Sequence, residues 1–391
     1  METDYSLYVH IPYCIKKCDY CDFFSVGNNC RVPDEYLSAL KSEIAVRALD
    51  YGVDCWNTVY IGGGTPSLLS PGQLSSLLTS IRKSTKAGNF DSTLEITMEM
   101  NPETVTREKL EVLSSEQVSR ISLGVQSFAD KSLEKVGRHC TSEKTVAALD
   151  MIRKNWSKRL NLDIIAGLPG ESEKEFLESL ERIISYDPDH ISMYTLTVED
   201  GTPLAGKIDS GVLDFDCDLA DSLWLRGRKV LSANGYRQYE VSNFSRPSME
   251  SIHNLRYWNQ KNYIGCGAGA CGTVYSDVSE RFTNTHDIAA YVKYWNSEKA
   301  CACHAPGTRE KLDMETREFE YLMMGFRTLR GIFSSEYERL FSADLRTRLG
   351  AVWKDFSDRG LCCENEEDGG GTRFSLNEKG ILLLNRFLVE L

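Results

Sequence analysis

The sequence lacks any apolar run near twenty residues, which excludes a transmembrane helix of ordinary length. It also lacks an excess of basic charge: the formal net charge is −12, which argues against broad nucleic-acid binding. No basic region followed by an apolar core occurs in the first residues, METDYSLYVHIPYC, so no signal peptide is expected. With 391 residues and a hydrophobic content of 41%, the chain is expected to be a soluble cytoplasmic protein with one large domain and a smaller one.

Three common cofactor patterns are missing as well. The glycine-rich segment Gly62–Gly64 is followed by Thr-Pro-Ser, so it is neither a P-loop nor G-x-G-x-x-G. Cys301-Ala302-Cys303-His304 lacks the C-x-x-C-H spacing of covalent haem attachment. We interpret these cysteines as ordinary thiols and leave the pair Cys303-His304 without an assigned role.

Cysteine itself is plentiful. Thirteen cysteines in a chain without an export signal indicate reduced thiols and metal ligation, not a disulfide framework. Cys14, Cys18 and Cys21 form a C-x3-C-x2-C pattern directly after a predicted strand, Leu7 to Ile11. Three thiolates on a four-iron cluster would leave one iron open for a non-protein ligand, because such clusters usually take four cysteines. Zinc, with His10 as a fourth ligand, and structural free thiols are the alternatives.

Strand and helix patterns alternate over the first half of the chain. Six strand–helix units with short connections predict a parallel sheet covered by helices, and six units indicate an open partial barrel. The predicted strands are 7–11, 57–61, 94–99, 120–125, 160–166 and 190–196.

Polar residues follow several of these strands. Glu99, Gln126 and Asp163 lie at or near strand ends, and Gly63, Gly64 and Thr65 follow the second strand. Since the carboxyl ends of parallel strands meet at one rim, these residues and the cysteine loop are expected to share a pocket.

The second half divides into two parts. Residues 236–300 contain His253 among aromatic residues, which suits a haem ligand or, more simply, a buried histidine. The small and polar segment 299–309 is expected to be a linker. Beyond it, helices at 313–329, 334–341 and 343–358, a hairpin at 361–376 and a helix at 378–391 predict a small winged-helix-like α+β domain over 310–391. The acidic segment 364–368 makes DNA contact by that domain an unfavourable interpretation.

The cysteine pattern, with an aromatic residue before Cys21, resembles the signature of the radical S-adenosylmethionine (radical SAM) superfamily. Tyr8-Val9-His10-Ile11-Pro12-Tyr13-Cys14 resembles a narrower group, the oxygen-independent coproporphyrinogen III oxidases and the HemW-type haem chaperones. The resemblance implies a [4Fe–4S] cluster whose open iron is chelated by S-adenosylmethionine, and a partial (β/α)6 barrel over residues 1–235. It also implies that S-adenosylmethionine is held by Tyr8, Tyr20, Gly63, Gly64, Thr65, Glu99, Gln126, Arg138, Asp163 and Thr197.

Two departures from the oxidases favour the chaperone branch. Phe23 stands where the oxidases have a further cysteine, and Cys14 comes early in the chain. The segment from His253 to Trp258, H-N-x-x-Y-W, also resembles the haem motif of the chaperones. The resemblance therefore implies a haem chaperone, with His253 as haem ligand, that passes haem from a donor protein to acceptor haemoproteins. A homodimer and peripheral membrane contact are further expectations.

Two other functions stay open at this point. The first is coproporphyrinogen III oxidase activity, so the chain could be an enzyme. The second is a zinc-stabilised scaffold without catalytic activity.

Overall fold

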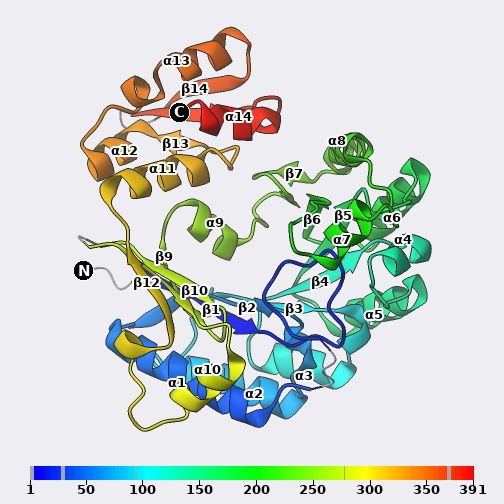
Figure 1. The fold of residues 1–391 in the computed structure, drawn as a ribbon, viewed down its shortest axis with the longest axis vertical. Helices are drawn as coiled ribbons and strands as arrows, with labels where there is room; N and C mark the ends of the chain where they lie inside the picture. The colour runs from blue at the N-terminus through cyan, green and yellow to red at the C-terminus, as the bar shows by residue number, and fades with distance from the viewer. Residues whose placement is uncertain (1–3, 28–30, 92, 277, 368–370) are drawn as a thin grey trace.

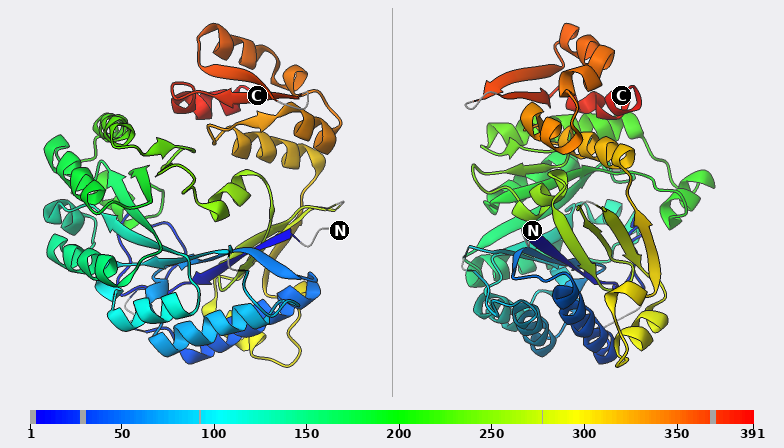
Figure 2. Two further views of the ribbon diagram at one scale, coloured as in Figure 1. Left: turned by 180° about the vertical axis from the view of Figure 1, so that it is seen from behind. Right: turned by 90° about the vertical axis from the view of Figure 1, so that its left-hand side faces the viewer.

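The computed structural model describes residues 4–27, 31–91, 93–276, 278–367 and 371–391. Within this part of the chain, one curved sheet of twelve strands carries helices on its outer face (Figure 1). The strand order is β12-β11-β10-β9-β1-β2-β3-β4-β5-β6-β8-β7. Figure 2 shows the C-terminal domain at one end of this curved body.

The middle of the sheet is the predicted parallel barrel. Its six strands pair in chain order, each parallel to the next, which confirms the predicted partial barrel. The strands are β1 (Asp4–Ile11), β2 (Cys55–Gly63), β3 (Glu95–Met100), β4 (Arg120–Gln126), β5 (Arg159–Ala166) and β6 (His190–Thr195). The helices between them are α1 (Asp34–Asp50), α2 (Pro71–Lys83), α3 (Arg107–Ser115), α4 (Asp130–Lys135), α5 (Ser142–Asn155) and α6 (Glu173–Ser185).

Strand alternation separates two environments. In β3, Ile96 and Met98 belong to the apolar core under the helices, whereas Glu99 on the opposite side of the strand lines a cavity. The same period of two recurs in β5, where Leu162 packs outward and Asp163 points inward. Because successive side chains of a strand face opposite ways, the outer face is hydrophobic and the interior is polar.

Both edges of the sheet are extended by residues after the barrel. On one edge β9 (Asn262–Cys266) runs parallel to β1, followed by the antiparallel strands β10 (Cys271–Val274), β11 (Glu280–Asn284) and β12 (Gly307–Lys311). On the other edge are β8 (Asn243–Ser245) and β7 (Arg237–Gln238). The accompanying helices are α7 (Pro203–Asp209), α8 (Cys217–Ala233), α9 (Ile252–Trp258) and α10 (Ile288–Trp295).

The segment expected to be a linker contributes to the sheet. It contains a 3-10 turn, Ala302–His304, and then β12, every residue of which is exposed. Composition did not indicate a strand here because an edge strand needs main-chain hydrogen bonds to its neighbour, in this case β11, and no apolar face.

The C-terminal domain has an apolar core of its own, which includes Phe326, Trp353 and Phe387. Its sheet has the order β13-β15-β14, and the turn residues 368–370 of the predicted hairpin lie outside the described residues. The elements are α11 (Met314–Gly325), β13 (Ile332–Phe333), α12 (Ser334–Phe341), α13 (Leu345–Asp358), β14 (Cys362–Glu367), β15 (Gly371–Leu376) and α14 (Leu384–Val389). The last predicted helix is shorter than expected and begins with a 3-10 turn, Ile381–Leu383.

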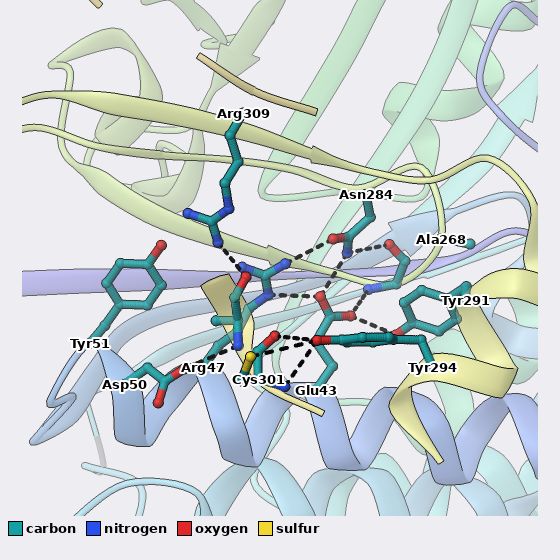
Figure 3. Close-up of polar contacts among 12 residues, drawn as sticks. Glu43, Arg47, Asp50, Tyr51, Ala268, Asn284, Tyr291, Tyr294, Cys301 and Arg309 are labelled. Carbon is teal, nitrogen blue, oxygen red and sulfur yellow. Dashed lines mark hydrogen bonds and ion pairs between the residues drawn. The ribbon is translucent and has the colours of Figure 1, made fainter. Parts of the chain in front are cut away.

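A buried carboxylate joins the first helix to the added strands. Glu43 on α1 is fully buried and accepts hydrogen bonds from Arg47 Nε (2.7 Å), Asn284 Nδ2 (2.7 Å), Tyr291 Oη (2.6 Å) and the main-chain N–H of Gly267 (2.7 Å) (Figure 3). Four donors compensate the cost of burying this charge. Glu43 therefore fastens the β9–β10 turn, β11 and α10 to the outside of the barrel.

We expect Glu43→Gln to lower the free energy of unfolding by about 3–5 kcal/mol, because it leaves the buried Arg47 guanidinium without its anion. Urea unfolding of the variant measures this. The control is Glu111→Gln, which breaks an exposed pair with Arg107 and should cost about 0.5 kcal/mol or less. Equal effects of the two substitutions would contradict the role given to Glu43.

Candidate cofactor site

A cavity of about 370 Å³ lies at the carboxyl ends of the barrel strands, where sites of such folds form. The structure brings twelve of the predicted site residues to its wall. They are Cys14, Cys18, Tyr20, Cys21, Gly63, Gly64, Thr65, Glu99, Gln126, Arg138, Asp163 and Thr197. Tyr8 and His253 do not line it.

The cysteine loop is closed by a bond within itself and is fixed to two other parts of the barrel. Main-chain bonds join Cys14 N to Val26 O (3.0 Å) and Asp19 N to Val136 O (2.9 Å), and the Asp19 carboxylate pairs with Lys207 of α7 (2.5 Å). Figure 1 shows this loop in dark blue, close to α7. Cys14 is buried and the other two thiols are half-buried. Burial raises the pKa of Cys21 to about 11, so a metal centre would have to displace the thiol protons.

Glycine lets the next loop approach the first cysteine. A Cβ on Gly64 would lie 2.8 Å from Cys14 Sγ and 2.8 Å from the Tyr13 carbonyl oxygen, and Gly63 has φ +118°. Few residues other than glycine adopt the φ of Gly63. At Gly64, no side chain fits at this distance from the sulfur. The loop therefore leaves space around Cys14 that any side chain would fill.

Glu99 lies beneath the glycine loop. Tyr60 Oη donates to its Oε1 (2.7 Å) and the main-chain N–H of Gly63 donates to its Oε2 (3.1 Å). Burial raises the pKa of Glu99 to about 7 in spite of these bonds. A cationic group in the cavity would favour the ionised form.

Arg138 and Asp163 are further charged groups of the wall. Arg138 is buried, its Nη1 lies 3.9 Å from Cys18 Sγ, and its Nε has no hydrogen-bond partner among the described residues. Asp163 accepts from Asn161 Nδ2 (2.6 Å), and burial raises its pKa. Gln126, which ends β4, has φ 71°, a strained value for a non-glycine residue that is typical of functional positions.

These donors fit the cofactors that the sequence suggests. Three thiols on one loop suit an iron–sulfur cluster with an open iron. The Arg138 guanidinium and the Glu99 carboxyl, which both line the cavity, suit a ligand that carries both an anionic and a cationic group.

His253 lies behind the cavity wall, on α9. Its Nδ1 is 2.7 Å from Thr58 Oγ1 and its Nε2 is 2.9 Å from Tyr257 Oη, so both ring nitrogens have hydrogen-bond partners. Its main-chain N–H donates to Glu95 (2.8 Å), and burial lowers the pKa of the imidazole to about 3. The neighbouring residue, Asn254, is the one from this motif that lines the cavity.

Tyr8 also supports the wall from behind. Its hydroxyl lies 2.8 Å from His10 Nδ1, and its ring stacks on Tyr60, which holds Glu99.

Several lining residues were not predicted. Tyr60, Arg120, Ser122, Asn161, Ser192 and Tyr194 all face the cavity. Tyr60, Ser122, Asn161 and Ser192 are each a polar or aromatic residue between apolar neighbours within a strand, whereas Arg120 and Tyr194 have an apolar neighbour on one side only. The alternation of apolar and polar residues along the strands could therefore have identified these lining residues. It continues into the barrel from the strand ends that the sequence analysis selected.

Comparison with known proteins identifies the class of protein to which the chain belongs. The family model of the radical SAM superfamily matches residues 8–183, and that of the HemN C-terminal domain matches residues 312–383. The solved structure of coproporphyrinogen III oxidase (HemN) from Escherichia coli superposes with a TM-score of 0.80 at 23% identity, covering 99% of this chain and 89% of that one. Fold and site thus define a radical SAM protein, a class that implies a [4Fe–4S] cluster and S-adenosylmethionine.

Curated relatives make the family more specific. The chain is 32% identical to heme chaperone HemW of Bacillus subtilis, covering 92% of this chain and 93% of that protein. It is 38% identical to heme chaperone HemW of Escherichia coli, covering 83% and 82% respectively. It is also 32% identical to a mitochondrial protein of Danio rerio, radical S-adenosyl methionine domain-containing protein 1, over 92% and 84%. The chain belongs to the HemW family. In the described ranges, no helix is both long and apolar enough to cross a membrane.

We expect Gly64→Ala to reduce the iron and sulfide bound after anaerobic reconstitution, because the new methyl group would collide with Cys14 Sγ and with the Tyr13 carbonyl. Iron and acid-labile sulfide analysis measures this. Gly72→Ala is the matched control, since a Cβ there meets nothing within 4 Å. Full iron content in Gly64→Ala would count against a role for the close approach of this loop to Cys14 in metal binding.

The buried imidazole of His253 gives a pH prediction. Between pH 6.5 and about 3 the unfolded chain protonates this residue and the folded chain does not. Its contribution to stability is therefore lost as the pH falls below 6.5, by up to about 1.4 kcal/mol per pH unit. We expect the stability gap between wild type and His253→Asn, measured by urea unfolding, to narrow from pH 7.5 to 5.5. A gap that does not change with pH would count against this burial.

Proposed function

We propose that Cys14, Cys18 and Cys21 ligate a [4Fe–4S] cluster and that the adjoining wall binds S-adenosylmethionine. One observation carries the proposal: three thiols, a glycine loop, two half-buried carboxyl groups and a buried guanidinium surround a single cavity. Bound together, the two groups supply one-electron chemistry, which belongs to the cofactors and not to the protein side chains.

Each wall residue has a chemical role in this proposal. Glu99 faces the amino group of S-adenosylmethionine, near Gly63, Gly64 and Thr65, and Arg138 pairs with its carboxylate. Asp163 accepts hydrogen bonds from the ribose hydroxyls, and Gln126 both donates and accepts. Tyr20 and Thr197 make additional contacts, while Tyr8 keeps Tyr60 and Glu99 in position.

We further propose that the protein is a cytoplasmic haem chaperone, which receives haem from a donor protein and delivers it to acceptor haemoproteins. The name of its relatives, heme chaperone, supports this function. The domain boundaries 1–235, 236–300 and 310–391, homodimer formation and peripheral membrane contact belong to the same proposal.

His253 is the proposed haem ligand. In the structure its Nε2 contacts Tyr257 Oη, so coordination of iron would require this hydrogen bond to break and α9 to shift. Helix α9 is short, with seven residues, and lies between the barrel and α11 of the C-terminal domain (Figure 1).

The test is a haem titration of anaerobically reconstituted protein. We expect His253→Ala to weaken haem binding about tenfold or more, which is at least 1.4 kcal/mol. His190→Ala is the control, because His190 is equally buried and also bonds through both ring nitrogens, to Asn161 and Tyr239.

Two results would contradict the proposal. Equal weakening by both variants would mean that the loss comes from damage to the barrel interior and not from a missing ligand. Consumption of coproporphyrinogen with release of carbon dioxide, without specific haem binding, would identify an oxidase instead.

A further inference from the structure

Two thiols and an imidazole gather on the 3-10 turn between α10 and β12, away from the cofactor cavity. Cys301 Sγ lies 3.2 Å from Cys303 Sγ and 3.2 Å from His304 Nδ1, and Cys303 Sγ lies 3.5 Å from His304 Nδ1. Over the described ranges, this is the one group of three or more Cys, His, Asp or Glu side chains whose ligand atoms all lie within 4.8 Å of one another.

The spacing of these atoms matches a tetrahedral metal ion. With Zn–S of about 2.3 Å and Zn–N of about 2.0–2.1 Å, tetrahedral angles place two sulfurs about 3.8 Å apart and sulfur and nitrogen about 3.6 Å apart. The observed separations of 3.2–3.5 Å differ from these by about 0.6 Å or less. Small side-chain rotations would therefore bring all three atoms onto one ion.

The main chain of the turn is held from three sides. Asp50, at the end of α1, accepts from Ala302 N (3.2 Å), and Arg309 of β12 donates to Ala302 O (2.5 Å). Tyr294 Oη of α10 donates to Cys301 O (2.8 Å) and accepts from Cys301 N (3.1 Å). Figure 3 shows Cys301 between Tyr294 and Asp50. Such outer contacts orient the ligands before any metal arrives.

We propose that Cys301, Cys303 and His304 form a second metal site, which binds Zn²⁺ through two thiolates and one imidazole nitrogen. Cys303 and His304 are exposed, so the fourth position faces solvent and takes water or an external ligand. Binding displaces the thiol protons into solvent and involves no change of oxidation state. The site is independent of the haem function proposed above.

A disulfide is the competing state of the same two cysteines. Their sulfurs are 3.2 Å apart, whereas an S–S bond measures about 2.05 Å. The structure therefore holds Cys301 and Cys303 as free cysteines, which can become thiolate ligands when a metal displaces their protons.

The test uses protein whose iron–sulfur cluster has been reconstituted anaerobically, so that Cys14, Cys18 and Cys21 are occupied. Zn²⁺ is titrated against a chromophoric chelator, and the bound zinc is examined by X-ray absorption at the zinc edge, which iron does not obscure. We expect one equivalent of zinc, with two sulfur neighbours near 2.3 Å and a nitrogen neighbour near 2.0–2.1 Å.

Three variants separate this site from other thiols. Cys303→Ser and His304→Ala each should lose the tightly bound equivalent, because both remove a ligand from an exposed position without disturbing the core. Cys217→Ser, an exposed cysteine on α8, should retain it. Zinc binding that is equal in all four proteins would overturn the proposal, as would a Cys301–Cys303 disulfide found by mass spectrometry in the protein kept under reducing conditions.

Discussion

The alternation of apolar and polar side chains along six parallel strands is the constraint on which this molecule depends. One set of side chains packs under the helices and builds a continuous hydrophobic core. The other set, which includes Glu99, Ser122 and Asp163, cannot leave the interior without breaking that core. The barrel is therefore lined with polar groups, and each must find a hydrogen-bond partner or a ligand.

That requirement explains why charge collects at the cofactor cavity. Glu99 is bonded by Tyr60 and Gly63, and Asp163 by Asn161, yet burial still raises the pKa of both carboxyl groups. The Arg138 guanidinium lies 3.9 Å from the Cys18 thiol, with one nitrogen unsatisfied among the described residues. A wall of this kind is prepared for a charged ligand, because its charged groups are held in place before the ligand binds.

A buried and fully hydrogen-bonded charge also holds the sheet extensions in place. Glu43 ties strands from residues 267–284 to a helix that is over two hundred positions earlier in the chain. This attachment also positions α10 and the turn at Cys301, since Tyr291 bonds to Glu43 and Tyr294 bonds to Cys301. The proposed zinc site and the barrel thus share one scaffold, although they use different ligands and different chemistry.

The sequence revealed those parts of the fold and of the site that depend on interactions between residues close together in the chain. Local signals predicted the ends of the six strands within three residues and the alternation of these strands with helices, because periodicity and capping residues act over a few positions. They failed for β12, because an exposed edge strand has no pattern of apolar residues to signal it. They also failed for the short α9. The environment of His253 was also beyond local reasoning, because its partner Thr58 is 195 positions away in the chain.

The sequence by itself determined the class of the protein and its parallel barrel, since the C-x3-C-x2-C spacing and the strand–helix repeat are local properties. Tertiary structure alone decided which polar residues share the cavity, that both nitrogens of His253 are occupied, and that Cys301, Cys303 and His304 converge. Each of these depends on contacts between distant segments or on the exact course of a turn. Such geometry is fixed by packing of the whole chain, which no short stretch of sequence encodes.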